Sequence, residues 1–406
     1  SSDWDSVRFT FPQPYIRFGK GTIAELPEMI IELLKTPHIY LQPVKLGEIK
    51  IMIVVGGNSL EKSGTLQRIT DICKEKSIQS QFFSCGSGEA SVEMVSNGVE
   101  FARSYSPHFI VGIGGGTPMD VAKSITGIYT NGGTIQEYHD GKNFNKPGLP
   151  FIAIPTTAGT ASEITNNAVL IDTARGFKKS IRGASLIAKG IILDPELTFS
   201  CTKEVTAYSG ADALVQAIEA FTSIKANPLA DIFAIDAIRM ISHNLQTAVR
   251  EPSNFAARSQ MLLGSFYAGV AFSNVGLGLV HGLAHPIGYK YMLPHGKCCG
   301  SLMPAVMKFN LPVREQKYAE IANILDTIGL LIKLRANATQ EEKAHSAIEM
   351  VRELFEAIGV PTHLRKLGLK KEDFDWIIAN TKGGSVNTNP REPTPELLHE
   401  LLENNW

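Results

Sequence analysis

The sequence lacks the features that mark several classes of protein. Five cysteines are few for 406 residues, and their spacing contains neither a CxxC pair nor a CxxCH motif. This scarcity excludes a disulfide-rich scaffold and favours a reducing compartment, so we expect a cytoplasmic protein. The formal net charge is only −1, from 39 basic and 40 acidic side chains. Such a balance gives no general reason to expect nucleic acid or an anionic membrane as a partner.

The sequence also lacks the pattern of a signal peptide or of a membrane span. Residues 1–21 are polar and aromatic, and no basic segment followed by an apolar one occurs among them. Residues 259–289 carry no Asp, Glu, Lys or Arg, but they include six glycines and two histidines. A spanning helix needs about 20 mostly apolar residues. We therefore expect no signal peptide and interpret residues 259–289 as interior helix of a soluble protein.

What the first half does contain is a series of short apolar runs. The runs are Ile51–Val55, Phe109–Ile113, Phe151–Pro155 and Gly190–Leu193. Helical patterns over residues 64–76 and 90–105 separate the first run from the second. Continuous apolar runs of this length are typical of parallel strands buried on both faces. Alternation with helices predicts βαβ units. We expect an α/β domain with a doubly wound sheet over residues 1–198.

After Asp194-Pro195 the pattern becomes helical, and apolar runs bounded by glycine disappear. The predicted helices cover residues 207–222, 228–246, 254–267, 339–358 and 395–403. No internal repeat or low-complexity linker is present. We expect an all-helical domain over residues 199–406, with the boundary near 195–203.

A glycine-rich turn follows the second of the apolar runs. Gly114-Gly115-Gly116-Thr117 opens a predicted helix, and glycine lets a backbone approach a pyrophosphate at a helix N-terminus. We predict that Gly115, Gly116 and Thr117, together with Asp120, bind a dinucleotide. The alternative is a tight turn that binds nothing, because glycine suits such turns in any case.

A second turn rich in hydroxyl groups follows the third run. Its side chains suit contacts with ribose, amide or phosphate at the carboxyl end of a strand. The residues of this turn that we predict to bind the nucleotide are Thr156, Thr157, Thr160 and Ser162. The alternative is helix capping by Thr160 or Ser162.

Histidines and one acidic residue form a candidate metal set in the second half. Asp212 and Gln216 are four residues apart, as are His281 and His285, and His295 follows. Residues at i and i+4 share a helix face. A lone buried histidine is usually a core residue, but three within 15 residues favour a site. One carboxylate with two imidazoles suits Fe(II) or Zn(II).

Taken in order, these motifs resemble those of the iron-containing (group III) alcohol dehydrogenases. The resemblance covers roughly residues 10–400 and rests on Gly114–Asp120, Thr156–Glu163, Gly210–Leu214, His281–His285, Pro294–Gly296 and Asn389–Arg391. It implies a dehydroquinate synthase-like fold, in which a Rossmann-like domain and a helical domain bind NAD(P) and one divalent metal.

The resemblance also implies roles for individual residues. Asp212, His281 and His295 fall on three of the family's four metal-ligand positions, whereas the fourth, usually histidine, is Gln216 here. A neutral amide oxygen binds Fe(II) or Zn(II) more weakly than imidazole does. His285 matches a histidine close to substrate and nicotinamide. Lys178 matches a position near the cofactor ribose; its alternative is a solvated surface lysine.

The chemistry so implied is hydride transfer between a small alcohol or aldehyde and the nicotinamide. The metal would act as a Lewis acid on the alcohol oxygen, and solvent, ribose hydroxyls or His285 would take the proton. As partners we expect only this substrate and further copies of the chain, in a homodimer or higher homo-oligomer.

The choice between NAD and NADP depends on the turn after the first apolar run. An acidic residue there would accept hydrogen bonds from the ribose 2′-hydroxyl and repel a 2′-phosphate. Family members that favour NAD tend to carry Asp at the position of Gly56, and here Asn58 and Ser59 follow. We predict a modest preference for NADPH. The alternative is a turn that contacts neither group.

Two other functions remain open. A dehydroquinate synthase-like lyase would need basic residues for a phosphorylated substrate, and residues 259–289 contain none. A metal-less nucleotide-binding relative is supported only by Gln216. The three histidines argue against it, because an inactive site has no need of imidazoles in an apolar surround.

Overall fold

The computed structural model describes residues 6–37, 39 and 43–406, and these form two compact units. The first, the sheet unit, comprises residues 12–157 and 161–198. The second, the helical unit, comprises residues 158–160 and 199–406, with residues 6–11.

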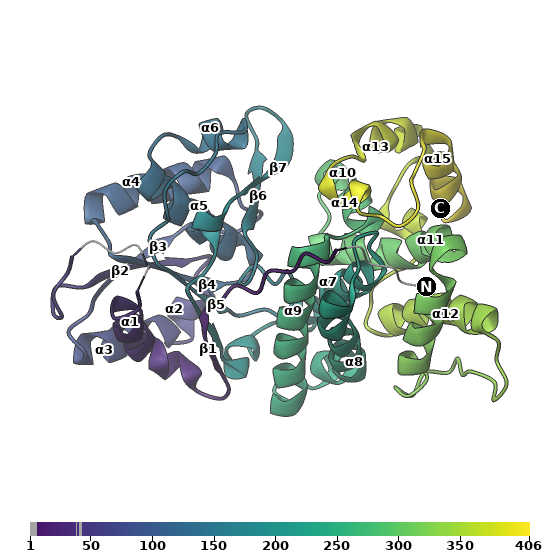
Figure 1. Cartoon of the computed structure of the whole chain (residues 1–406), viewed down its shortest axis with the longest axis horizontal. Coiled ribbons are helices and arrows are strands. Elements are labelled where there is room, and N and C mark those ends of the chain that lie inside the picture. Colours follow the sequence, from purple (N-terminus) through teal and green to yellow (C-terminus); the bar gives the residue numbers. More distant parts are fainter. Residues whose placement is uncertain (1–5, 38, 40–42) are drawn as a thin grey trace. The chain divides into compact units, whose positions relative to one another are not determined.

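A six-stranded sheet, parallel throughout, forms the centre of the sheet unit (Figure 1). In spatial order its strands are β1 (Tyr15–Phe18), β8 (Gly190–Leu193), β5 (Phe151–Pro155), β4 (Phe109–Gly114), β2 (Lys50–Val55) and β3 (Gln79–Ser84). The residues of β4, β5 and β8 are buried throughout, as are all of β2 after Lys50. The predicted parallel α/β fold is confirmed.

Helices cover the sheet on both faces, with α1 and α3 on one side and α4 and α5 on the other (Figure 1). The helices of this unit are α1 (Leu26–Leu34), α2 (Ser59–Lys62), α3 (Thr65–Glu75), α4 (Val92–Tyr105), α5 (Gly116–Asn131) and α6 (Ile135–His139), with short 3-10 turns at η1 (Thr22–Glu25), η2 (Ala184–Leu186) and η3 (Pro195–Thr198). An antiparallel hairpin, β6 (Asn167–Asp172) with β7 (Phe177–Arg182), stands apart from the sheet.

The strand order reverses direction between β2 and β4. From β2 the chain passes through α3 to β3 on one side, and then returns through α4 to β4 on the other side. At such a switch point the loops after adjacent strands diverge and leave a crevice at their carboxyl ends. The two glycine turns singled out in the sequence follow β2 and β4, so they meet at this point.

The helical unit has no strand among its described residues, as expected from the sequence. Its elements are α7 (Lys203–Thr222), α8 (Pro228–Arg250), α9 (Phe255–Val275), α10 (Leu279–Tyr291), α11 (His295–Leu325), α12 (Gln340–Ala357), η4 (Leu364–Leu367), η5 (Lys371–Asp373), α13 (Phe374–Asn380), α14 (Gly384–Asn387) and α15 (Pro395–Asn404). Helices α7, α8 and α9 run side by side (Figure 1), and α7 is almost wholly buried from Gly210 to its end.

Two segments pack differently from the division expected at residue 198. The rings of Phe9 and Phe11 stack on Phe233 of α8, with centroids 6.1 and 6.0 Å apart. The carbonyl of Gly159 accepts a hydrogen bond of 3.2 Å from the hydroxyl of Ser265 on α9. These contacts attach residues 6–11 and 158–160 to the helical unit. A functional division of the chain at residue 198 therefore remains a proposal.

The uncharged segment 259–289 falls in α9 and α10, joined by a sharp bend. No single helix in the described part of the chain is long and apolar enough to cross a membrane. Taken together, α9 and α10 pass the same test of length and composition, but they are bent by 104°. Both helices have most of their residues buried inside the unit.

The turn after β4 predicts a specific effect of substitution. Gly114 has φ of +145°, and a Cβ there would lie 2.4 Å from Cγ of Pro118. We expect Gly114→Ala to lower the free energy of unfolding by about 1–3 kcal/mol, the usual cost of such a backbone conformation. At Gly57 the φ is not positive and no atom lies within 4 Å, so Gly57→Ala is the matched control. Urea unfolding gives the free energy of unfolding of both variants. Equal values for the two would contradict the predicted strain at position 114.

Candidate functional site

Helix α7 presents three polar side chains from the interior of the helical unit. Asp212, Gln216 and Glu219 are spaced at i, i+4 and i+7, which places them on one helix face. Their exposed fractions are only 2–3%. The helix begins at the N-cap Thr202, whose hydroxyl accepts from the backbone N–H of Val205 at 3.1 Å. Three polar groups on one buried face need partners from neighbouring elements.

The first partner is His281, at the start of α10. Its Nδ1 lies 2.5 Å from Oε1 of Glu219, and its Nε2 lies 3.1 Å from Oδ1 of Asp212. The other carboxylate oxygen of Glu219 accepts from the backbone N–H of Val280 at 3.0 Å. Glu219 therefore fixes both the ring orientation of His281 and the backbone that carries it.

The C-terminal motif supports the same helix end. Oδ1 of Asn389 accepts from the backbone N–H of Leu279 at 3.0 Å, and its amide donates to Oδ1 of Asn310 on α11 at 2.8 Å. The N-cap Gly278 has no side chain that could satisfy this N–H. Asn389, singled out with Pro390 and Arg391 in the sequence, thus caps the helix that carries His281.

Helix α11 brings the remaining members of the cluster. Nε2 of His295 lies 3.6 Å from Oδ1 of Asp212, and its side chain is 27% exposed. One turn later, Sγ of the fully buried Cys299 lies 3.6 Å from Nε2 of His295 and 3.7 Å from Nε2 of His281. The candidate ligand atoms of Asp212, His281, His295 and Cys299 all lie within 4.8 Å of one another.

This cluster fits a divalent cation. Nε2 of Gln216 donates to Oδ2 of Asp212 at 3.2 Å, whereas its Oε1 is buried and accepts no hydrogen bond from any described residue. Asp212, two imidazoles and a thiol are all ligand types for Fe(II) or Zn(II). An imidazole whose other nitrogen is held by a carboxylate is the usual arrangement for a metal-binding histidine. The predicted metal residues Asp212, Gln216, His281 and His295 are thus brought together.

Electrostatics within the cluster favour a carboxylate at Asp212. Burial raises the pKa of Asp212, but the adjacent His295 and His281 outweigh it and leave the pKa below its ordinary value. Burial lowers the pKa of His281, but Cys299 and Glu219 outweigh it and hold the pKa well above the ordinary value. Burial raises the pKa of the Cys299 thiol to about 12.

His285 lies beside the cluster, one turn after His281 on α10. Its ring is stacked with that of His295, with centroids 5.8 Å apart and an interplanar angle of 26°. His285 thus adjoins one of the candidate metal ligands. The catalytic role itself remains a proposal.

In the sheet unit the predicted nucleotide residues gather where β2, β4 and β5 end. A Cβ at Gly56 would lie 3.8 Å from Pro118 of the turn after β4. A Cβ at Gly115 would lie 3.5 Å from the side chain of Thr157, and the N–H of Thr156 donates to the carbonyl of Gly114 at 2.9 Å. The three loops therefore form one edge, with Gly57, Asn58 and Ser59 exposed on it.

Other predicted nucleotide residues make contacts within the protein. Oδ1 of Asp120 accepts from the hydroxyl of Ser162 at 2.6 Å, and Oδ2 accepts from the N–H of Val169 at 3.1 Å. The hydroxyl of Thr117 donates to the carbonyl of Gly88 at 2.6 Å. Asp120 and Ser162 thus tie α5 to the segment that leads into β6. The helix-capping alternative for Thr160 and Ser162 is wrong, because turns and a strand follow them.

Lys178 lies on β7 and is largely covered. Its side chain is 14% exposed, and Nζ forms an ion pair of 3.0 Å with Glu89. The alternative of a solvated surface lysine is therefore wrong. Glu89 belongs to the loop after β3, which also reaches Thr117 through Gly88.

Sequence reasoning missed two residues of the site, namely Cys299 in the metal cluster and Glu219, which binds His281. Glu219 is three residues after Gln216, and Cys299 is four residues after His295, so each continues a helical spacing already noted. Only their contacts with neighbouring helices single them out.

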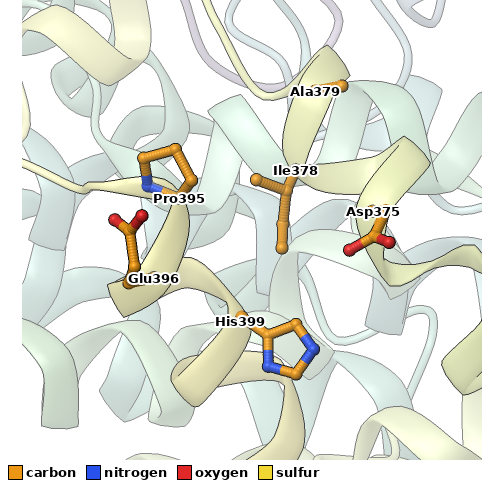
Figure 2. Close-up of a pocket in the computed structure, with 6 residues that line it drawn as sticks. All are labelled: Asp375, Ile378, Ala379, Pro395, Glu396 and His399. Atoms are coloured by element: carbon orange, nitrogen blue, oxygen red, sulfur yellow. The ribbon is translucent and has the colours of Figure 1, made fainter.

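A separate pocket lies between α13 and α15 (Figure 2). It has a volume of about 610 Å³ and is lined by Asp375, Ile378, Ala379, Pro395, Glu396 and His399. None of these residues is predicted as a site residue or belongs to the metal cluster. Within the described residues, the cluster around Asp212 is the only group of acidic, histidine and cysteine side chains spaced as metal ligands are.

Comparisons with known proteins agree with this geometry. The family model described as "Iron-containing alcohol dehydrogenase" matches residues 13–195. The model described as "Fe-containing alcohol dehydrogenase family, C-terminal" matches residues 206–406. The chain belongs to the iron-containing alcohol dehydrogenase family. Like other members, this iron-containing alcohol dehydrogenase is an oxidoreductase that depends on NAD(P) and a divalent metal.

Three similar proteins illustrate the family. The NAD-dependent methanol dehydrogenase of Bacillus methanolicus is 33% identical over 356 residues, 87% of this chain and 92% of that protein. The NADPH-dependent butanol dehydrogenase of Clostridium saccharobutylicum is 31% identical over 407 residues, 98% and 97% of the two chains. The solved structure of a 1,3-propanediol oxidoreductase has a TM-score of 0.89 at 32% identity, covering 98% of this chain and 100% of that one.

The first prediction for this iron-containing alcohol dehydrogenase concerns His281. Replacing His281 by Ala removes one ligand and leaves Glu219 without its imidazole partner. We expect His281→Ala to lose most bound metal and activity, measured by elemental analysis and aldehyde reduction. The matched control is His345→Ala, an exposed histidine on α12. Full metal content in the His281 variant, with a native circular dichroism spectrum, would contradict the ligand assignment.

The second prediction concerns Glu219, which orients His281 without itself joining the ligands. Glu219→Gln keeps the side-chain size but removes the charge that binds Nδ1 of His281. We expect metal affinity to fall about 10–100-fold, the usual effect of removing such a partner. Competition with a chromophoric chelator measures the affinity, and Glu204→Gln, exposed on the same helix, is the control. Equal affinities for the two variants would show that Glu219 has no such role.

Proposed function

We propose that this enzyme transfers a hydride between a small alcohol or aldehyde and NADP(H), with Asp212, His281 and His295 holding one divalent metal. The observation that carries the proposal is the convergence of these three side chains, together with the carboxylate of Glu219 that orients His281. Gln216 serves as a weak or absent fourth ligand, since its amide nitrogen already donates to Asp212.

In this proposal the metal ion and the dinucleotide supply the reactive groups, and the chain binds and orients them. A bound divalent ion would polarise the substrate oxygen as a Lewis acid, and the nicotinamide would carry the hydride. Asp212 is held as a carboxylate by its histidine neighbours, which suits a cation ligand. His285, whose ring stacks on that of His295, would exchange the proton of the alcohol oxygen at an imidazole nitrogen.

The sheet unit would hold the dinucleotide at the edge where β2, β4 and β5 end. Gly115, Gly116 and Thr117 would contact the pyrophosphate at the start of α5, a helix of 16 residues. Thr156, Thr157 and Thr160 would line the ribose and nicotinamide. Asp120, Ser162 and Lys178 were predicted to bind the cofactor. In this proposal Asp120 with Ser162, and Lys178 with Glu89, position the loops that would bind it.

For its surroundings we propose a reducing compartment, the cytoplasm, and assembly as a homodimer or higher homo-oligomer. No disulfide joins any of the five cysteines, all of which lie in the described part of the chain, and Cys73, Cys298 and Cys299 are buried.

One experiment separates this proposal from its two alternatives. Metal-stripped protein is assayed with NADPH or NADH and a panel of short aldehydes, before and after addition of Fe(II) or Zn(II). We expect reduction that depends on the added metal. Activity without metal, or dinucleotide binding with no reduction of any aldehyde, would contradict the proposal. A lyase would bind NAD(P) but leave it unconsumed.

The preference for NADPH rests on the turn after β2. This turn carries no acidic side chain before Glu61, and Gly57, Asn58 and Ser59 are exposed. Backbone N–H groups of a glycine turn and small polar side chains can accommodate a 2′-phosphate, whereas a carboxylate would repel it.

Gly56 has room for the substitution that tests this preference. The nearest atoms to a Cβ at Gly56 are 3.7–3.8 Å away, an ordinary contact distance. We expect Gly56→Asp to shift the ratio of kcat/KM for NADPH over NADH toward NADH by about tenfold, which corresponds to about 1.4 kcal/mol. The uncharged Gly56→Ala is the control and should leave the ratio near its native value. A clear native preference for NADH would show that this interpretation of the turn is wrong.

A further inference from the structure

The thiol of Cys299 is the one member of the metal cluster that neither the motifs nor the family resemblance assigns. It lies one turn after His295 on α11, and its side chain is fully buried. Sγ lies 3.6 Å from Nε2 of His295 and 3.7 Å from Nε2 of His281. These are the same two nitrogen atoms that face Asp212.

Helix geometry distinguishes Cys299 from its neighbour. Successive residues on a helix point about 100° apart, so Cys298 and Cys299 cannot face the same cluster. The sulfur of Cys298 lies 3.9 Å from the carbonyl of Ala284, in the apolar packing between α10 and α11. Only Cys299 brings its sulfur among the ligand atoms.

The side chain of Gln216 binds Asp212 and does not take the place of a histidine ligand. Its amide nitrogen donates to Oδ2 of Asp212 at 3.2 Å, which leaves the other oxygen, Oδ1, facing His281 and His295. A side chain that orients the carboxylate in this way does not replace the strong fourth donor that an imidazole at its position would provide.

We propose that Cys299 binds the metal as a thiolate, so that the ligand set is Asp212, His281, His295 and Cys299. This inference rests on the proposed function, because it assigns a further ligand to the same metal. The thiol proton is released to water as the sulfur–metal bond forms, and no oxidation or reduction takes place. Gln216 positions Asp212 by its hydrogen bond.

The thiolate changes the charge of the site and its preference among metals. Asp212 and a thiolate place two negative charges among the ligand atoms, and these attract a divalent cation to a buried site where an unpaired charge is costly. Thiolate is a soft ligand and favours Zn(II), whereas carboxylate and water suit harder ions. A thiolate ligand therefore favours Zn(II) over harder divalent ions at this site.

Cobalt(II) is the probe for the sulfur ligand. The full-length protein is stripped of metal, loaded with Co(II) and examined by absorption spectroscopy, with Cys299→Ser, Cys299→Ala and Cys298→Ser compared in parallel. We expect a near-ultraviolet sulfur-to-cobalt charge-transfer band in the native protein and in Cys298→Ser, and no such band in either Cys299 variant. Circular dichroism and thermal unfolding verify that each variant is folded.

Zinc binding gives a second measurement. X-ray absorption of the zinc-loaded protein should contain a Zn–S distance of about 2.3 Å, and Cys299→Ser should lose it. That variant should bind zinc about 100-fold more weakly or worse, since removal of an outer partner alone costs about 10–100-fold. Cys298→Ser should retain both the sulfur distance and the native affinity.

The outcomes separate this inference from the proposed function. Native protein that binds Co(II) with ligand-field bands but without the sulfur band would overturn the thiolate ligand and leave the site of Asp212 and the two histidines intact. Native protein that takes up no Co(II) or Zn(II) would overturn both the ligand and the proposed metal-dependent function. Retention of the sulfur band by a folded Cys299→Ala variant would also overturn the assignment.

Discussion

The metal cluster depends on the carboxylate of Glu219, which links α7 to the start of α10. One of its oxygens binds Nδ1 of His281, and the other accepts the N–H of Val280 at the first turn of α10. The same imidazole then directs Nε2 toward Asp212 on the preceding part of α7. Because Glu219 and Asp212 lie on one face of a single helix, the position of His281 relative to Asp212 is set by helix geometry.

This arrangement also explains how so many polar groups can occupy an almost wholly buried face. Two buried carboxylates would be costly if they were unpaired, since desolvation opposes their charge. Asp212 and Glu219 each have an imidazole partner, and Asp212 receives the amide of Gln216 as well. Asn389 satisfies the N–H of Leu279 at the start of α10.

The sequence predicted the elements whose burial is uniform. Strands β2, β4, β5 and β8 are buried along nearly all of their length, so they are continuous apolar runs in the sequence. The edge strands β1 and β3 pair on one side only and keep polar residues, for example Gln79 and Gln81. For that reason they resemble loops. The hairpin of β6 and β7 was missed because its half-exposed strands carry no continuous apolar run bounded by glycine, and β7 has polar residues at Lys178, Lys179 and Ser180.

The candidate site was predicted for the residues that recur at i and i+4, namely Asp212, Gln216, His281 and His285, and for His295 by its motif. Glu219 and Cys299 were missed, because a single carboxylate or thiol on a helix gives no signal until the neighbouring helix is placed against it. Only tertiary contacts decide that Glu219 meets His281 and that Cys299, rather than Cys298, faces the ligand atoms.

Anomalous X-ray scattering from crystals of the zinc-loaded protein tests the central claim most directly. Data collected on both sides of the zinc edge locate the ion without any assumption about activity. The account predicts one strong peak per chain, bounded by Asp212, His281, His295 and the sulfur of Cys299. A peak among Asp375, Glu396 and His399 in the pocket between α13 and α15, with none at Asp212, would contradict it.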